Sequence, residues 1–430
     1  MYLPTEAIGE AESSPAGHRE TGALAGLRVL DLSGQSYQYC GKLFAQLGAD
    51  VILVEPPCGS PARLEGPFLE DIPHKETSLA FAYFNQGKKG MGLDLDSIEG
   101  RQIFRKLVKT AHIVVESEKP GTMKQRGLGE PDLRALNPGL IVTSITSFGQ
   151  SGPYSAYQSD DLVASALGGL LYLGGYAGGI PTSAHGNQAC LAAAQFAAVA
   201  TLMAVWEVES QTGDPIGQHI DVSVQECVVM ALENAVQFVD LENTVRRRTG
   251  GQQKQAGTGV FPCQDGEIYL MAGGIASNRF WNAATEWLVE EGAPGAGRLR
   301  EAHWNDLDYL ASDEAKDYFA SVFLPFAANK TKAELYADGQ RRRIPICPVS
   351  TPADLPVNRQ LAYRNFFQQT PHPYTGNTLL APGAPYRLSA TPWQLGPPAP
   401  RLGEHTSGIL AQLGYGKDER SVLLRAGVIA

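Results

Sequence analysis

The chain has 430 residues, a formal net charge of −10 and a pI near 5.4, with 43% hydrophobic and 19% charged residues. This composition is that of a globular protein long enough for two domains, and it excludes a mainly disordered chain. The acidic charge argues against nucleic acid as the main partner, because a phosphate backbone requires a basic surface. It does not exclude a local site for a small anion.

Residues 1–22 are polar, contain four glutamates and lack the basic start and apolar core of a signal peptide, so they predict a disordered tail. The longest apolar run, 190–208, is alanine-rich and includes Gln195 and Glu207. It predicts a buried helix rather than a membrane span. The cysteines are scattered and form no Cys-x-x-Cys pair, which predicts neither a structural metal site nor a disulfide framework. Reduced thiols indicate the cytoplasm.

The first elements after the tail predict a Rossmann-like half. Residues 27–32 form an apolar run of strand length, residues 40–47 are helical in pattern, and residues 51–55 form a second strand. Strand, helix and strand at this spacing predict a parallel pair joined by a right-handed crossover. The first strand is not followed by Gly-x-Gly-x-x-Gly, which argues against dinucleotide binding.

The same alternation continues through the first half of the chain. We expect a helix over 100–110, strands over 111–116, 140–145 and 217–224, and a helix beginning near Gln225. A further strand and a final helix are expected over 266–272 and 407–413, after a proline-rich extended arm over 392–400. The predicted organisation is a tail 1–22, a large Rossmann-like domain 23–245, a linker 246–259, a small α+β domain 260–345, and a return segment 346–430.

Polar groups concentrate in the stretch that precedes the apolar helix expected over 189–206. They include the acidic pair Asp160 and Asp161, and then His185 and Asn187 just before the helix. A helix N-terminus offers free N–H donors and favours negative charge, so such a stretch often forms a site. The same residues also fit a loop and a helix cap without chemistry.

Several separated segments resemble the class III CoA-transferase family, which includes formyl-CoA transferase, carnitine CoA-transferase and α-methylacyl-CoA racemase. They follow the family's order over nearly the whole chain from Leu24, at 24–55, 137–169, 213–228 and 400–406. The resemblance implies a Rossmann-like large domain, a smaller α+β domain and long linkers. It also implies a dimer whose two chains interlock like linked rings.

In this family a single aspartate, in a Gly-Asp step before the buried helix, attacks the acyl-CoA thioester. The matching step in this chain is Gly186-Asn187. An amide is a poor nucleophile, because its nitrogen lone pair is delocalised and it carries no negative charge. No Asp or Glu occurs between Leu162 and Trp206 to take its place. The resemblance therefore implies a chain that lacks the usual covalent step at Asn187.

Three other residues are candidates for acid–base chemistry. Asp160 falls where the racemase branch has its histidine, and Asp161 matches a position that is often acidic in the family. His185 lies beside the Gly-Asn step and is the third candidate. Helix caps and turn contacts are the alternative roles for both aspartates, and a plain hydrogen-bonding role is the alternative for His185.

The resemblance also assigns positions that contact coenzyme A, which would be a substrate rather than a tightly bound cofactor. These positions are Gln35, Lys88, Lys89, Leu93, Ser117, Gln125 and Arg126. Pro56 and Gln125 occupy two positions that are basic in the family, which weakens the expected binding of the CoA phosphates. Lys88, Lys89 and Arg126 are the candidate replacements, or else solvated surface charges.

A family match along the chain and a missing nucleophile together predict a subunit of a hetero-oligomeric CoA-transferase whose homologous partner carries the aspartate. The succinyl-CoA:benzylsuccinate transferase is a two-gene member of this type. The expected reaction moves CoA from a CoA thioester to a carboxylic acid, without a metal, a nucleic acid or a membrane. Two alternatives remain open: a self-sufficient acyl-CoA isomerase, racemase or lyase of the same fold, and a noncatalytic acyl-CoA binding protein.

Overall fold

The computed structural model describes residues 22–273, 279–372 and 374–430, so nearly all of the predicted tail lies outside the described residues. The chain forms two compact units. Among the described residues, the sheet domain comprises 22–168, His185–Ala231 and Arg364–Ala430, and the small domain comprises Gly169–Ala184 and Leu232–Tyr363. The chain thus leaves the sheet domain after Ala231 and returns at Arg364, whereas the sequence analysis placed these changes after residues 245 and 345.

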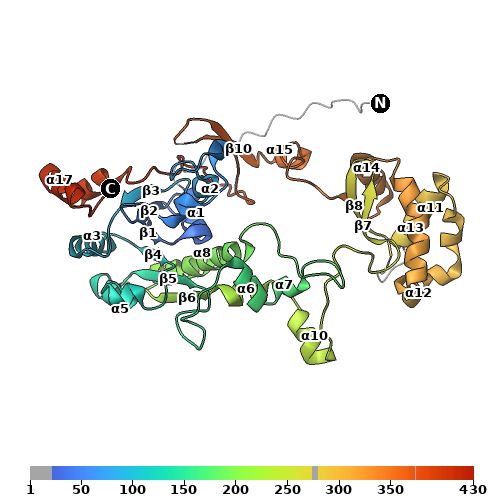
Figure 1. Cartoon of the computed structure of the whole chain (residues 1–430), viewed down its shortest axis with the longest axis horizontal. Helices are drawn as coiled ribbons and strands as arrows, with labels where there is room; N and C mark the ends of the chain where they lie inside the picture. The colour runs from blue at the N-terminus through green and yellow to red at the C-terminus, as the bar shows by residue number, and fades with distance from the viewer. Residues whose placement is uncertain (1–21, 274–278, 373) are drawn as a thin grey trace. The chain divides into compact units, whose positions relative to one another are not determined.

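A six-stranded parallel sheet forms the centre of the sheet domain, in the order β3-β2-β1-β4-β5-β6 (Figure 1). This is the strand order of a doubly wound Rossmann-like sheet, so the predicted α/β fold is confirmed. Every residue of β4 and β5 is buried, as expected for central parallel strands covered on both faces. The strands are β1 (Arg28–Leu32), β2 (Asp50–Glu55), β3 (Lys89–Gly92), β4 (Ile113–Glu116), β5 (Ile141–Thr146) and β6 (His219–Ser223).

Helices cover the sheet and bury apolar side chains against it. Helix α3 is a clear example, because Ile103, Phe104 and Leu107 share one helix face and join a core with Leu30 and Val114. The helices of the sheet domain are α1 (Tyr39–Gln46), α2 (Leu79–Phe84), α3 (Ile98–Val108), α4 (Thr122–Gln125), α5 (Glu130–Leu136), α6 (Asp161–Leu167), α8 (Gln188–Glu209), α9 (Val224–Met230), α16 (Thr406–Gln412) and α17 (Lys417–Arg425).

Helix α8 corresponds to the predicted buried helix, but only one of its faces is buried. By length and composition alone it could cross a membrane, yet its small residues Ala193, Ala194 and Ala197 pack against the sheet domain without exposure. It contacts β5, β6, α1 and α9. The opposite face is apolar and open, with exposed fractions of 45% for Phe196, 57% for Val199, 68% for Met203 and 75% for Trp206.

The small domain contains an antiparallel sheet, ordered β7-β8-β9, that packs on helices around an aromatic core. Trp281, Trp287, Phe319 and Phe323 are all nearly unexposed in this core. An α+β arrangement was predicted here, and the antiparallel pairing confirms it. The elements are β7 (Thr258–Cys263), β8 (Gly266–Met271), β9 (Ile346–Pro348), α7 (Leu170–Leu173), α10 (Ala235–Glu242), α11 (Arg279–Glu290), α12 (Leu307–Ala311), α13 (Asp313–Ala327), α14 (Lys332–Arg342) and α15 (Arg359–Tyr363).

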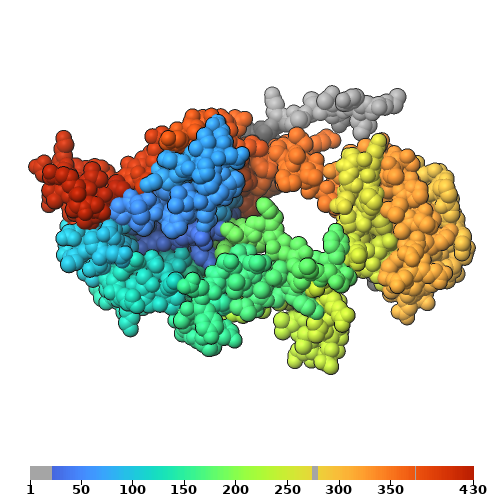
Figure 2. Space-filling model, viewed as in Figure 1, coloured from blue at the N-terminus to red at the C-terminus, as the bar shows by residue number. Residues whose placement is uncertain are grey.

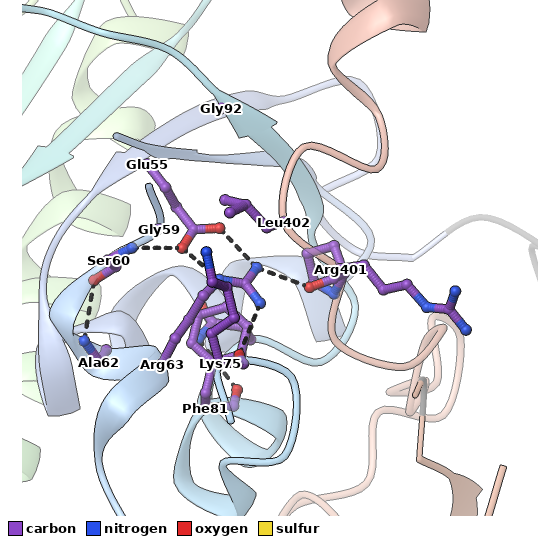
Figure 3. Close-up of polar contacts among 12 residues, drawn as sticks. Glu55, Gly59, Ser60, Ala62, Arg63, Lys75, Phe81, Gly92, Arg401 and Leu402 are labelled. Carbon is purple, nitrogen blue, oxygen red and sulfur yellow. Dashed lines mark hydrogen bonds and ion pairs between the residues drawn. The ribbon is translucent and has the colours of Figure 1, made fainter. Parts of the chain in front are cut away.

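The C-terminal segment returns to the sheet domain through the hairpin β10 (Phe367–Pro371) and β11 (Thr378–Pro382). Figure 2 shows the orange and red C-terminal residues against the blue N-terminal part of this domain. Arg63 fixes the contact: it binds both oxygens of Glu55 at 2.7 and 2.8 Å and the carbonyl of Pro400 at 3.0 Å (Figure 3). The guanidinium also contacts Glu76 at 3.0 Å. This buried cluster attaches the returning segment to the carboxyl end of β2.

Candidate functional site

A cavity of about 420 Å³ lies at the carboxyl edge of the parallel sheet, where β1, β4 and β5 end and α6 and α8 begin. The strand order reverses between β1 and β4, which is where open parallel sheets bind ligands. We call it the Asn187 cavity. Its polar lining includes Gln35, Tyr37, Glu65, Ser117, Glu118, Lys119, Asp160, Asp161 and Asn187.

Asn187 lies at the N-terminus of α8 and directly follows Gly186. Gly186 has a φ of 77°, a left-handed conformation that favours glycine, and this turn delivers the Asn187 side chain to the cavity. The Asn187 Nδ2 donates a hydrogen bond of 2.8 Å to the Oγ of Ser36, which is 1% exposed. A carboxamide held in this way can orient a ligand, but it carries no charge with which to attack a thioester.

The acidic pair lines the same cavity, and both carboxylates are bound to backbone N–H groups. Asp160 caps α6, because its Oδ1 accepts a 2.8 Å hydrogen bond from the backbone N–H of Val163. Asp161 accepts a 3.0 Å hydrogen bond from the backbone N–H of Cys190 and so ties α6 to the first turn of α8. The geometry therefore gives both aspartates a positioning role for the helices at the cavity.

Two other titratable groups of the Asn187 cavity, Cys190 and Tyr37, are poor nucleophiles. Burial raises the pKa of the Cys190 thiol to about 12, so the thiol stays protonated at neutral pH. Burial also raises the pKa of the neighbouring Tyr37 phenol far above its usual value. His185 is exposed in the loop before α8 and is not among the described residues that line the cavity.

Glu65 is a cavity residue that sequence reasoning missed. It follows the 3-10 turn Pro61–Leu64 and is half-buried. Burial raises the pKa of its carboxyl group, and a hydrogen bond from the Gln35 side chain offsets part of that shift. Ser36, Tyr37 and Cys190 were missed as well. None of these residues belongs to a motif. Only the folding of the sheet, which brings the loops after its strands to one edge, places them near Asn187.

A second hollow of about 260 Å³ follows the carboxyl ends of β1, β2, β3 and β4, and we call it the strand-end groove. It shares Ser117 and Glu118 with the Asn187 cavity. Of the positions expected to contact CoA, it contains Leu93, Ser117 and Arg126, while Gln35 lines the Asn187 cavity. The Ser117 Oγ accepts a 2.9 Å hydrogen bond from a backbone N–H and so joins the ends of β1 and β4.

Arg126 is the basic residue of the strand-end groove, and it is already bound to two carboxylates. It forms ion pairs of 2.8 Å with Asp96 and 2.9 Å with Glu118. Gln125 is exposed and lines an outer hollow beside Arg126. The two carboxylates offset the positive charge of Arg126, so the strand-end groove attracts a phosphate only weakly.

The two lysines expected to contact CoA point elsewhere. Lys88 is 1% exposed, and its Nζ forms a 2.7 Å ion pair with Asp31, so it is neither a solvated surface charge nor accessible to a phosphate. Lys89 begins β3, at the amino edge of the sheet, and pairs with Asp50 at 2.6 Å. This placement gives no support to a CoA contact for Lys88 or Lys89. The consecutive lysines lie at the amino end of β3, a strand that the sequence analysis did not predict.

The sequence as a whole matches known CoA-transferases. Residues 24–406 match the family described as CoA-transferase family III. The chain is 41% identical over 403 residues to the succinyl-CoA:(R)-benzylsuccinate CoA-transferase subunit BbsE of Thauera aromatica, covering 94% of this chain and 97% of that protein. It is 28% identical over 401 residues to the succinyl-CoA–L-malate CoA-transferase beta subunit of Chloroflexus aurantiacus, covering 91% and 94%.

Solved structures show the same architecture. A CaiB/BaiF family protein from Brucella suis superposes with a TM-score of 0.79 at 25% sequence identity. The superposition covers 92% of this chain and 100% of that one.

Proposed function

The chain belongs to CoA-transferase family III, and on this basis we propose that it is the subunit without a nucleophile in a hetero-oligomeric CoA-transferase. The observation that carries the proposal is the neutral carboxamide of Asn187 at the start of α8, where the family resemblance places the attacking aspartate. A homologous partner subunit with a Gly-Asp step at that position supplies the carboxylate that forms the covalent intermediate.

The contacts of Asp160, Asp161 and Cys190 support this proposal, because none of these three groups is ready to replace the attacking aspartate. Asp160 and Asp161 accept hydrogen bonds from backbone N–H groups, which lower the nucleophilicity of a carboxylate. The thiol of Cys190 is held protonated by burial. An isomerase or lyase that uses the aspartates with His185 would need that histidine in the cavity, and it lies outside the lining.

The names of the relatives support a choice of substrates. Both the Thauera aromatica and the Chloroflexus aurantiacus proteins are named as subunits of transferases that use succinyl-CoA. We propose succinyl-CoA as the donor and an aromatic or dicarboxylic acid, such as benzylsuccinate, as the acceptor. Free thiols at all six cysteines support a cytoplasmic location.

The open face of α8 supports a permanent partner. Phe196, Val199, Met203 and Trp206 form a continuous apolar stripe, and stripes of this kind mark protein–protein interfaces. We propose that the homologous partner covers it, in the interlocked arrangement that the resemblance implies. Replacing Met203 and Trp206 together by Glu is expected to prevent co-purification of the two subunits, whereas replacing the exposed Ile98 by Glu is not.

The test compares this chain alone with a mixture of this chain and its co-encoded homologue. CoA exchange from succinyl-CoA to benzylsuccinate is measured by chromatography of the CoA esters. Exchange is expected only in the mixture, and an Asp→Asn change in the partner's Gly-Asp step is expected to abolish it. Asn187→Ala in this chain is expected to leave most of the exchange intact.

Two outcomes would contradict the proposal. Full exchange by this chain alone, surviving Asn187→Ala, would indicate a self-sufficient enzyme of the same fold. CoA binding without turnover in either preparation would indicate a noncatalytic acyl-CoA binding protein.

A further inference from the structure

Three hollows at the carboxyl edge of the sheet domain adjoin one another through shared lining residues. The Asn187 cavity shares Ser117 and Glu118 with the strand-end groove. The groove in turn shares Asp96 and Arg126 with a third hollow of about 600 Å³, which lies against α3 and α4. An elongated ligand with one end at Asn187 can therefore extend along the sheet edge to this outer hollow.

The outer hollow is basic, unlike the groove that leads to it. Its lining residues include Arg101, Arg105 and Arg126 and a single acidic residue, Asp96. Arg126 is neutralised by its two ion pairs. Within the described residues, neither Arg101 nor Arg105 forms an ion pair with a carboxylate. The net positive charge of the outer hollow therefore comes from these two arginines.

Backbone carbonyls hold both arginines in place without cancelling their charge. Arg101 and Arg105 are four residues apart on α3 and so share one helix face. The Nη1 of Arg101 donates to the carbonyl of Asp96 at 2.7 Å, and the Nη2 of Arg105 donates to the carbonyl of Gly127 at 2.9 Å. A guanidinium has five N–H donors, so each side chain keeps donors for an anion.

The strand-end groove cannot offer the same charge. Pro56 and Gln125 stand where the family resemblance places basic residues, and Arg63, near the end of β2, is 0% exposed and bound to Glu55. A dianionic group at the far end of the ligand therefore finds cations without a carboxylate partner at Arg101 and Arg105, in the outer hollow.

We propose that Arg101 and Arg105 bind the 3′-phosphate of the adenosine end of coenzyme A, as a replacement for the basic residues absent at Pro56 and Gln125. The inference rests on the proposed function, because it takes a CoA ester to be the ligand. It adds that this subunit binds CoA although it lacks the nucleophile. It also assigns the phosphomonoester to two residues that the family resemblance leaves without a role.

Calorimetric titration of the full-length chain with CoA and with 3′-dephospho-CoA tests the assignment. CoA is expected to bind about tenfold more tightly or better, because charge-assisted hydrogen bonds to the phosphate are lost in the dephospho compound. Arg101→Gln with Arg105→Gln is expected to weaken CoA binding to the dephospho-CoA level and to leave dephospho-CoA binding unchanged. The matched control, Lys109→Gln with Lys124→Gln, removes two exposed charges outside the hollow and is expected to keep the difference.

Competition distinguishes a nucleotide site from a general anion site. Adenosine 3′,5′-bisphosphate is expected to displace CoA from the unaltered chain, whereas inorganic phosphate at the same concentration is not. Equal binding of CoA and dephospho-CoA, binding of neither, or equal displacement by inorganic phosphate would overturn the assignment. These measurements use the unaltered chain, so they test the assignment even if a variant fails to fold. CoA exchange by the two-subunit mixture reports separately on the proposed function.

Discussion

Two regions of the carboxyl edge of the sheet differ in how they use charge: the buried Arg63 cluster at β2 and the open region, which is the Asn187 cavity at α8. At β2 the charges of Arg63 and Glu55 are fully buried and bound to each other, and they hold the returning segment at Pro400. At α8 the cavity is open, and its central group, Asn187, is neutral. The comparison shows two uses of the same sheet edge. Paired charges stabilise the fold at β2, whereas an uncharged and accessible side chain lies at α8.

Placing a charge at the open region should have the largest effect. Asn187→Asp introduces a carboxylate where the Ser36 hydroxyl can donate to it and where the N-terminus of α8 favours negative charge. The single chain is expected to gain a covalent CoA adduct with succinyl-CoA, seen by intact-protein mass spectrometry. Its CoA exchange rate is expected to rise by roughly a thousandfold or more over background, as nucleophile effects do. Asn187→Ala is the control, and a folded Asp variant without an adduct would contradict the expectation.

Removing a charge from the Arg63 cluster at β2 should lower the stability of the fold. Arg63→Met leaves Glu55 buried without its partner, and breaking a buried pair costs about 3–5 kcal/mol of unfolding free energy. Urea unfolding followed by circular dichroism measures the loss. Lys89→Met breaks a pair in which the lysine is 45% exposed, and should cost about 1 kcal/mol or less. Similar costs for the two variants would mean that the cluster at β2 does not stabilise the fold.

Lys42 sharpens the comparison, because it is 2% exposed on α1 and packs over the Tyr83 ring. Burial, and then the nearby Lys88, lower its pKa to about 7. Between that pKa and its ordinary value of 10.5 the unfolded chain binds more protons, so raising the pH stabilises the fold. From pH 7 to 9 the wild-type chain is expected to gain about 1–2 kcal/mol more stability than Lys42→Met. Urea unfolding at both pH values measures this, and parallel changes in both proteins would refute it.

The smallest effect is expected at Asp160, which lines the open region but serves as a helix cap. Asp160→Ala removes the hydrogen bond to the N–H of Val163 and should cost about 1 kcal/mol of stability. CoA exchange by the two-subunit mixture should stay within about twofold of the wild-type rate. A loss of exchange far beyond the loss of folded protein would instead give Asp160 a direct role in the reaction.

The alternation of strands and helices was predictable because each element has its own local signal. The apolar runs at β1, β2, β4 and β5 and the helical pattern of α3 agree with the structure. Strand β3 had no such signal, because Lys89–Gly92 is short and half glycine. A Cβ on Gly92 would lie 2.6 Å from the Cβ of Ala430, so the close approach of Ala430 to this strand requires glycine at position 92.

The sequence by itself determined the doubly wound fold and the neutral group at residue 187, since periodicity and residue identity are local properties of the chain. Tertiary structure alone decided which residues accompany that group. Glu65 and Ser36 join Asn187, Lys88 turns inward to Asp31, and Arg126 joins Arg101 and Arg105 at one hollow. The physical reason is that crossover connections bring the ends of sequence-distant strands to one edge, where packing decides which side chains stay accessible.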